Sequence, residues 1–298
     1  MTRDPLVDVP CAACGGLETH QLYVKFDLPI AACVTCGLVR ATPRCPPERI
    51  AARYSAEYFW NEYLPSQGVV NGQVTPDFID ARYAPWVSLL AAHGISRGRL
   101  LEIGTGAGLF LKAFARAGWD TVGVEVNADA AAFARDTLQL DVRSVYADTL
   151  DVPDGSMDVV AMMDVIEHVP DPGATIATAH RFLKPGGLLL MQTPNLDALS
   201  RRALGEPWAV LSPAEHLYYF TASTLDALMR QRGFSSTTFV WDFPGFGPAE
   251  TMNARYTHAP NAWRAHAYGA AVRLGGRALL SLVRRLHLTD QLIVVGRA

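Results

Sequence analysis

Residues 100–110 hold the side chains whose types and spacing could do chemistry. The short apolar run 100–103 is typical of a buried strand, and it carries one carboxylate, Glu102. Three glycines follow at alternate positions, and a helical pattern begins directly after them and stops at Gly118. Glycines let the backbone bend sharply and let a ligand reach bare main chain, while the helix N-terminus offers unpaired N–H groups to an anion. The stretch therefore predicts a strand, a ligand-binding glycine turn and a helix.

The glycine spacing narrows the choice of ligand. Gly104, Gly106 and Gly108 give G-x-G-x-G, whereas a dinucleotide loop needs a third small residue at the position of Leu109. Glu102 stands two residues before the first glycine, where it suits a ligand with an amine beside its carboxylate. S-adenosylmethionine carries both groups. The alternative is a glycine-rich turn that serves only packing.

Two more carboxylates follow predicted strands. Glu125 lies at the end of strand 121–126 and 21 residues after Gly104, a distance at which an acid can accept both ribose hydroxyls. Asn127 can cap the next predicted helix, 128–140. Asp148 follows strand 142–145, 23 residues after Glu125. Because ligands of open α/β sheets bind at the carboxyl ends of the strands, these acids should share one edge. The alternative for Glu125 is an ordinary carboxylate at a strand end.

Four of the five cysteines form two C-x-x-C pairs, Cys11 with Cys14 and Cys33 with Cys36. Eighteen residues separate the pairs, and a glycine follows each pair. Four thiolates at this spacing can surround one zinc ion, and four sulfur ligands leave no open position, so the metal would be structural. Two disulfides are the alternative, which a reducing cytosol disfavours. Cys45 is expected to be a linker residue.

The first 42 residues are therefore predicted to form a zinc ribbon, with a short strand within residues 20–30. Its positive charges are few (Arg3, Lys25 and Arg40), which disfavours a nucleic-acid role for the ribbon.

Composition bounds the class of protein. The 298 residues are 50% hydrophobic and 18% charged, which suits a filled globular core. The net charge of −3 gives no global basic field, so nucleic acid is an unfavoured partner. No apolar stretch resembles a signal peptide or a transmembrane segment. We expect a soluble, cytoplasmic protein without a membrane partner.

The remaining chain divides in two. Residues 43–95 begin with a proline-rich linker, continue with an aromatic cluster that is either core or a lid (Tyr54, Tyr58, Phe59, Trp60 and Tyr63), and end in an amphipathic helix over 77–93. Residues 96–298 alternate strands and helices, which predicts a doubly wound α/β sheet.

Several motifs resemble one family. Residues 100–110 resemble motif I of class I S-adenosylmethionine-dependent methyltransferases. Residues 164–172, Asp-Val-Ile-Glu-His-Val-Pro-Asp-Pro, closely resemble the loop after strand four in the ubiquinone-biosynthesis-type group. The phrase Phe-Leu-Lys-Pro-Gly-Gly at 182–187 is typical of this superfamily, and zinc-ribbon methyltransferases carry a similar tyrosine-rich segment before the catalytic domain.

The resemblance covers nearly the whole chain and implies a Rossmann-like sheet of seven strands, methyltransferase activity (EC 2.1.1.-) and S-adenosylmethionine as cofactor. In such enzymes an acid at the position of Asp148 receives the adenine amino group. The cofactor-binding residues it implies are Glu102, Gly104, Thr105, Gly106, Gly108, Glu125, Val126, Ala147, Asp148, Met163 and Asp164.

The acceptor side is less defined. An alcohol, phenol or amine loses a proton when it is methylated, and a histidine can accept that proton. By analogy with the family, His168 and His216 lie at the acceptor pocket, and Glu167 and Glu215 could orient them or accept the proton. A purely structural role for either histidine is the alternative.

Residues 245–288 form an arginine-rich insert of helical pattern before the last strand, 290–296 (Arg255, Arg264, Arg273, Arg277, Arg284 and Arg285). It is expected to be a solvated helix pair, a homodimer contact or a cap for an acidic substrate. A small-molecule acceptor is the first hypothesis for the whole chain. The rivals are methylation of an rRNA or tRNA base and a non-catalytic scaffold that binds S-adenosylmethionine.

Overall fold

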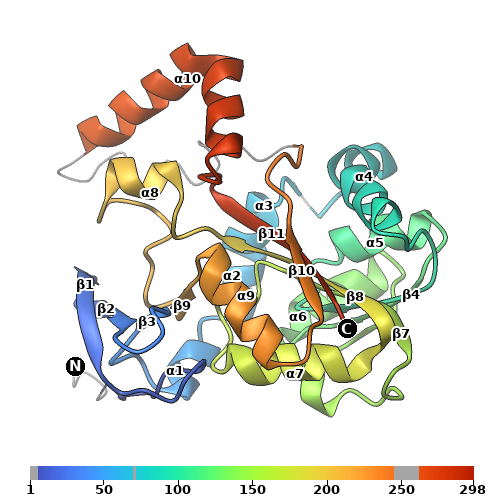
Figure 1. The fold of residues 1–298 in the computed structure, drawn as a ribbon. Coiled ribbons are helices and arrows are strands. Elements are labelled where there is room, and N and C mark those ends of the chain that lie inside the picture. Colours follow the sequence, from blue (N-terminus) through green and yellow to red (C-terminus); the bar gives the residue numbers. More distant parts are fainter. Residues whose placement is uncertain (1–5, 70–71, 245–261) are drawn as a thin grey trace.

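The computed structural model describes residues 6–69, 72–244 and 262–298, and its centre is a sheet of seven strands (Figure 1). The strand order is β10-β11-β8-β7-β4-β5-β6. The strands are β4 (Arg99–Ile103), β5 (Asp120–Val124), β6 (Val142–Arg143), β7 (Met157–Met163), β8 (Leu183–Pro194), β10 (Ser236–Phe239) and β11 (Gln291–Arg297).

The direction of the strands matches the fold that the family resemblance implies. The five strands from β6 to β8 are parallel to one another, and β11 runs antiparallel between β8 and β10. The predicted doubly wound sheet of seven strands is confirmed.

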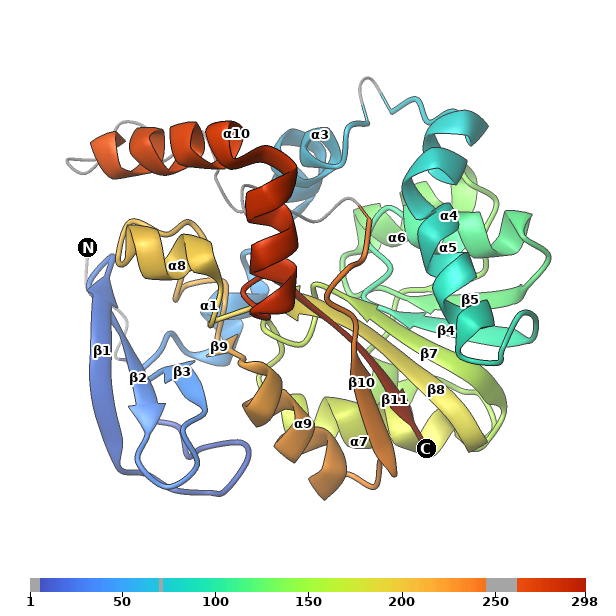
Figure 2. The same cartoon turned by 45° about the horizontal axis from the view of Figure 1, so that its top comes forward.

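Alternating residues of the buried strands feed two hydrophobic layers. In β8, Leu188 and Leu190 face one layer while Leu189 and Met191 face the other, as the two-residue period of a strand requires. Figure 2 shows helices on both sides of the sheet. The first layer holds α4 (Pro76–Ala92), α5 (Leu109–Arg116) and α6 (Ala128–Asp136), and the second holds α7 (Pro172–Phe182) and α9 (Ala222–Gln231).

The helix ends follow the predicted signals with small differences. The Asn127 side chain caps α6 by accepting bonds from the amides of Asp129 and Ala130. Gly118, with φ of 86°, follows the end of α5 as expected. The helix predicted over 128–140 ends at Asp136 instead.

The N-terminal residues form a second sheet, β1 (Thr19–Lys25), β2 (Leu28–Cys33) and β3 (Val39–Ala41), which β9 (Tyr218–Tyr219) completes. The strand predicted within residues 20–30 forms as two strands rather than one, because the chain reverses at Phe26 and Asp27. Their φ angles of 55° and 61° fit the two-residue hairpin turn whose twist matches the flanking strands.

Short helices fill the segment between the two sheets: α1 (Pro47–Ala51), α2 (Ala56–Tyr58), the π-helix η1 (Phe59–Tyr63) and α3 (Leu64–Ser66). We call residues 54–67 the aromatic segment. Phe59 is buried and its ring packs edge-on against Phe133 of α6, so part of this segment is core. A further short helix, η2 (Ala147–Thr149), follows β6.

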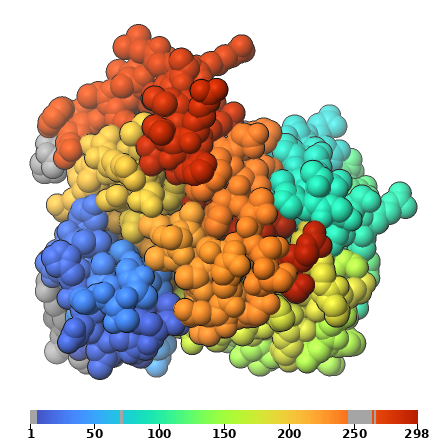
Figure 3. All heavy atoms as spheres, in the orientation of Figure 1, coloured from blue at the N-terminus to red at the C-terminus, as the bar shows by residue number. Residues whose placement is uncertain are grey.

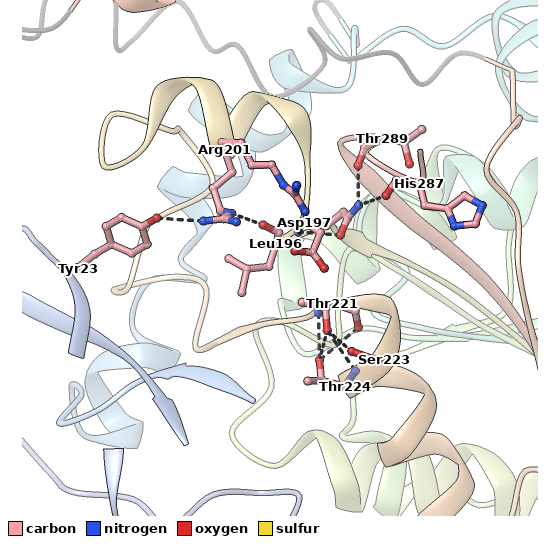
Figure 4. A network of polar contacts seen from close by, with 11 residues as sticks. Tyr23, Leu196, Asp197, Arg201, Thr221, Ser223, Thr224, His287 and Thr289 are labelled. Atoms are coloured by element: carbon pink, nitrogen blue, oxygen red, sulfur yellow. Dashed lines mark hydrogen bonds and ion pairs between the residues drawn. The ribbon is translucent and has the colours of Figure 1, made fainter. Parts of the chain in front are cut away.

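The helix α8 (Leu199–Leu204) joins the ribbon sheet to the main domain. Its Arg201 donates to the Leu196 carbonyl and to the Tyr23 hydroxyl of β1, the latter at 3.1 Å (Figure 4). The Asn195 side chain donates to the carbonyl of Thr289 at 2.9 Å, beside β11.

The helix α10 (Ala262–Arg285) lies over α8 and bends at Gly276, whose φ is 46° (Figures 1 and 2). The helical prediction for the insert is thus confirmed over 262–285, whereas Arg255 lies outside the described residues. Within the ranges that the structure describes, no helix has both the length and the apolar composition of a membrane span.

Candidate active site

A cavity of about 1210 Å³ opens at the carboxyl ends of β4, β5 and β7, with the aromatic segment along one wall. Ligand pockets usually measure about 300–1,000 Å³, so this cavity has room for two ligands side by side. Ten of the eleven predicted cofactor-binding residues line it: Glu102, Gly104, Thr105, Gly106, Glu125, Val126, Ala147, Asp148, Met163 and Asp164.

Gly108 is the exception, and its role is packing. A Cβ atom there would lie 2.8 Å from Leu140 Cδ1 and 2.9 Å from Ala134 Cβ, so a side chain would separate the start of α5 from α6. Its φ of 81° is also in the left-handed region. The third glycine thus shapes the turn, while Gly104 and Gly106 face the cavity.

Glu102 places an unsatisfied carboxylate oxygen beside the glycine turn. The residue is 2% exposed, and its Oε2 atom has no hydrogen-bond partner. Burial raises the pKa of this carboxyl well above its usual value, and the nearby Glu125 raises it further. A ligand ammonium group would satisfy the oxygen and stabilise the charged form, so the residues fit the amine end of S-adenosylmethionine.

Glu125 holds the glycine turn in place. Its Oε2 accepts from the Gly106 amide and its Oε1 from the Asn127 amide, each at 2.8 Å. Burial raises the pKa of Glu125, and these main-chain bonds partly offset that effect. A ribose hydroxyl would therefore use the remaining lone pairs of a carboxylate already fixed in orientation.

Asp164 begins the loop after β7 with a strained backbone. Its φ of 53° is unusual for a residue other than glycine, and such strain gathers at functional sites. Gln192 donates to its Oδ2 at 2.6 Å, and burial raises its pKa to about 7. The next residue, Val165, packs closely on Gly104. A Cβ atom added to Gly104 would lie 2.5 Å from the Cγ2 atom of Val165.

The two predicted histidines lie together, but only His168 lines the cavity. Their ring centroids are 4.6 Å apart, and His216 stands behind His168 with its Nδ1 2.8 Å from the Val210 carbonyl. The His168 Nδ1 lies 2.9 Å from the Glu215 carbonyl. Burial lowers the pKa of His168 to about 3, with help from His216, and that of His216 to about 4. Both rings are therefore neutral at pH 7.

Glu167 is buried behind His168 and does not line the cavity. Its Oε2 accepts from the Thr193 hydroxyl at 2.9 Å, while its Oε1 lies 3.9 Å from His168 Nε2. Burial and the nearby Asp164 raise its pKa well above normal. One donor atom each from Glu167, His168 and His216 lies within 4.8 Å of the others. Two imidazoles and a carboxylate can hold a divalent cation or relay a proton.

Arg53 ties the aromatic segment to the Glu215 side chain, a link that sequence reasoning missed. Its guanidinium donates to Glu215 Oε1 at 2.9 Å and to Glu62 Oε2 at 3.1 Å, and it lies 4.8 Å from the ring centroid of Tyr58. Arg53 thus holds the Glu215 carboxylate, while the main-chain carbonyl of Glu215 positions His168. No spacing pattern connects residues 162 positions apart, so no sequence signal could have revealed the pair.

The four predicted zinc ligands converge at the ribbon. The Sγ atoms of Cys11, Cys14, Cys33 and Cys36 all lie within 4.8 Å of one another, with Cys11 to Cys36 at 3.4 Å and Cys14 to Cys33 at 3.5 Å. These separations exceed a disulfide bond, and all four are free thiols. The cluster can hold one tetrahedral metal ion.

Main-chain bonds connect the ribbon to the cavity wall. The Ala41 amide of β3 donates to the Leu217 carbonyl at 2.9 Å, and the Leu217 amide donates to the Glu167 carbonyl at 2.7 Å. The ribbon thereby supports the segment that carries Glu215 and His216.

The strand order, the glycine turn and the acids at the carboxyl ends of the strands (the acidic rim) define a class I methyltransferase fold. A family model described as "Methyltransferase domain" matches residues 77–238, more than half of the chain, and the chain belongs to that family.

Curated relatives of this chain include ubiquinone biosynthesis O-methyltransferases. That of Methylococcus capsulatus is 34% identical over 116 residues, which cover 37% of this chain and 49% of the relative. That of Cereibacter sphaeroides is 34% identical over 146 residues, covering 45% and 59%. The chain thus spans about half of the length of the curated relatives it matches.

Solved structures show the same fold at low identity. A SAM-dependent methyltransferase from Archaeoglobus fulgidus is 16% identical, with a TM-score of 0.52, over 80% of this chain and 100% of that chain. A SAM-dependent methyltransferase from Thermotoga maritima, described as a possible histamine N-methyltransferase, is 21% identical, with a TM-score of 0.50, over 81% and 97%.

Proposed function

We propose that this chain transfers a methyl group from S-adenosylmethionine to a small-molecule acceptor. The observation that carries the proposal is the unpartnered Glu102 oxygen beside the Gly104–Gly106 turn, in a cavity with room for two ligands. The O-methyltransferase relatives favour an oxygen of a phenol-like acceptor, with a sugar or another metabolite as a wider class.

Each part of the cofactor has a matching group on the cavity wall. Glu102 would accept from its amine, and the bare main chain of Gly104 and Gly106 would let its carboxylate approach closely. Glu125 would accept from the ribose hydroxyls and Asp148 from the adenine amino group, while the walls beside them come from Thr105, Val126, Ala147 and Met163. The bound cofactor supplies a methyl group on a sulfonium, which is a good leaving group. The chain positions the partners and excludes water.

Asp164 is the best-placed proton acceptor. It lines the cavity beside the glycine turn, and a pKa of about 7 is near the optimum for a general base at neutral pH. His168 also lines the cavity, but a pKa of about 3 makes it a weak base. We therefore assign His168, with His216 and Glu167 behind it, to shaping the acceptor wall, and Glu215 to holding the aromatic segment through Arg53.

The ribbon would bind one structural zinc ion per chain through its four cysteines, because a complete sulfur shell leaves no site for substrate. We retain the proposed division into a ribbon (1–42), a linker and helical lid (43–95) and a methyltransferase domain (96–298). A cytoplasmic location and a homodimer remain predictions.

Transfer of radiolabel from S-adenosylmethionine tests the function. Intact, zinc-loaded protein is incubated with small-molecule extracts and, separately, with bulk RNA. The proposal expects label in the small-molecule fraction. Label in RNA alone would favour the base-methylation alternative, and cofactor binding without transfer to either fraction would favour a scaffold.

A further inference from the structure

The outward face of α10 carries an apolar stripe that its own packing does not use. We call the parts of α10 before and after the bend at Gly276 its first and second arms. In the first arm, four exposed residues follow one another at intervals of four, four and three positions: Trp263, Ala267, Ala271 and Leu274. This is the spacing of one helix face. Trp263 is 67% exposed and Leu274 is 90% exposed.

The second arm repeats the pattern after the bend at Gly276. Ala278, Leu282 and Leu286 are exposed at four-residue intervals, with Leu282 at 51% and Leu286 at 55%. Leu282 and Leu286 are large apolar side chains on successive turns, and together with Trp263 and Leu274 they favour a contact surface over chance exposure.

A basic stripe runs beside the apolar one along both arms. His266 and Arg273 flank it in the first arm, and Arg277 and Arg285 flank it in the second, all exposed. Residues 262–289 contain no aspartate or glutamate. The described acids nearby include Asp197, which pairs with Arg202, and Asp242, beside Arg284 and Arg285. They also include Glu206, next to Gly205 at Arg264, and the buried Asp290, which lies near Tyr268 and accepts from Ser200.

The opposite face of the helix anchors it to the domain. Tyr268 is buried in a cluster with Leu204 and Trp208, and Val272 packs against the same cluster. Arg264 donates to the Ala203 carbonyl at 2.9 Å at the end of α8. Figure 3 shows α10 projecting at the edge of the molecule.

Contrary to the expectation of no membrane partner from composition, we propose that α10 docks the protein on an anionic membrane surface, with the apolar stripe entering the headgroup boundary and the arginines contacting lipid phosphates. A basic amphipathic helix with tryptophan and leucine on its apolar face is the pattern of an interfacial helix. A second copy of this face would set one basic stripe against another in a two-fold contact, with like charges opposed. Phosphate binding to RNA would leave the leucines exposed.

Sedimentation with vesicles tests the proposal on the full-length chain. Vesicles of phosphatidylcholine alone are compared with an equal mixture of phosphatidylcholine and phosphatidylglycerol, at low and high salt. We expect binding to the anionic vesicles only, weakened by salt. Leu274→Asp and Arg273→Ser should each weaken binding by about tenfold or less and together by more than either alone.

Matched control variants test whether vesicle binding depends on this face of α10 or on any exposed leucine or arginine. Leu17→Asp changes a leucine of similar exposure (72%) on the ribbon, and Arg97→Ser removes an exposed arginine before β4; both should bind like the parent. Equal binding to neutral vesicles, or equal loss in the controls, would overturn the proposal. So would vesicle-independent self-association lost in Leu274→Asp, or RNA binding lost in Arg273→Ser. Thermal unfolding checks that every variant is folded, and cofactor binding reports the methyltransferase site independently.

Discussion

The hydroxyl of Tyr63 lies directly against Gly106, so that even a single Cβ atom on this glycine would overlap it. Tyr63 ends the π-helix of the aromatic segment, and π-helical turns often occur at functional sites. The Gly106 amide meanwhile donates to Glu125. The aromatic segment therefore contacts the turn that we assign to cofactor binding, and the absence of a side chain at Gly106 makes that contact possible.

Gly106→Ala should weaken binding of S-adenosylhomocysteine by more than about tenfold, because the methyl group would displace Tyr63 and the turn it covers. Gly118→Ala is the matched control, since its φ of 86° imposes a similar backbone strain of roughly 1–2 kcal/mol but no atom lies within 4 Å of its added Cβ. Equal affinities of the two variants, measured by calorimetry, would argue against a role of this turn.

Glu102→Gln should also weaken the same ligand by more than about tenfold, since the amide removes the charge that faces the ligand ammonium. The variant should be at least as stable as the parent at pH 8, because burial raises the pKa of Glu102 and disfavours its ionised form in the folded protein. An unchanged dissociation constant would remove Glu102 from the cofactor site.

Asp164→Asn should lower kcat/KM by about 10²–10⁴-fold, the usual contribution of a general base. In the parent enzyme the rate should rise with pH through about 7 as Asp164 ionises, and this limb of the pH–rate profile should disappear in the variant. A variant whose profile keeps the same limb would show that another group accepts the proton.

The stability of this variant provides an independent check on Asp164. Its folded-state pKa of about 7 exceeds the ordinary value of 3.8, so the folded state binds more protons than the unfolded state between these values. The contribution of Asp164 is therefore complete below pH 3.8 and is lost as pH rises toward 7. Denaturant titrations should show the variant gaining stability relative to the parent across that range.

Metal analysis should find one zinc ion per chain, and Cys14→Ser should lose it. Because β3 pairs with β9 beside Glu215 and His216, loss of the metal should also reduce thermal stability. Cys45→Ser, outside the cluster, should keep both the zinc and the stability. Folded protein without metal and with four titratable thiols would contradict the assignment.

Local patterns carried most of what the sequence could predict. The Gly104–Gly108 turn, the Asn127 cap and the acids at strand ends depend on neighbours within a few residues, and the structure places them as expected. The hairpin at Phe26 and Asp27 was missed because the turn lacks the glycine or asparagine that usually marks positive φ.

Contacts between distant segments account for the rest. The pairing of Tyr219 with Val39 joins residues that no periodicity relates, and so does the bond between Arg53 and Glu215. The pKa of Asp164 depends on burial by several elements, which a linear motif does not record. The sequence therefore indicated which edge of the sheet carries the proposed cofactor site, but it did not show which residue on the acceptor side is best placed to accept a proton.

Calorimetric titration of the intact, zinc-loaded chain with S-adenosylhomocysteine tests the central claim most directly. We predict one site per chain with a micromolar dissociation constant, because the Glu102 oxygen, the glycine turn and the acidic rim already stand in place around the cavity. A folded, zinc-loaded protein that releases or absorbs no heat of binding over the titration, at two temperatures, would contradict the methyltransferase assignment.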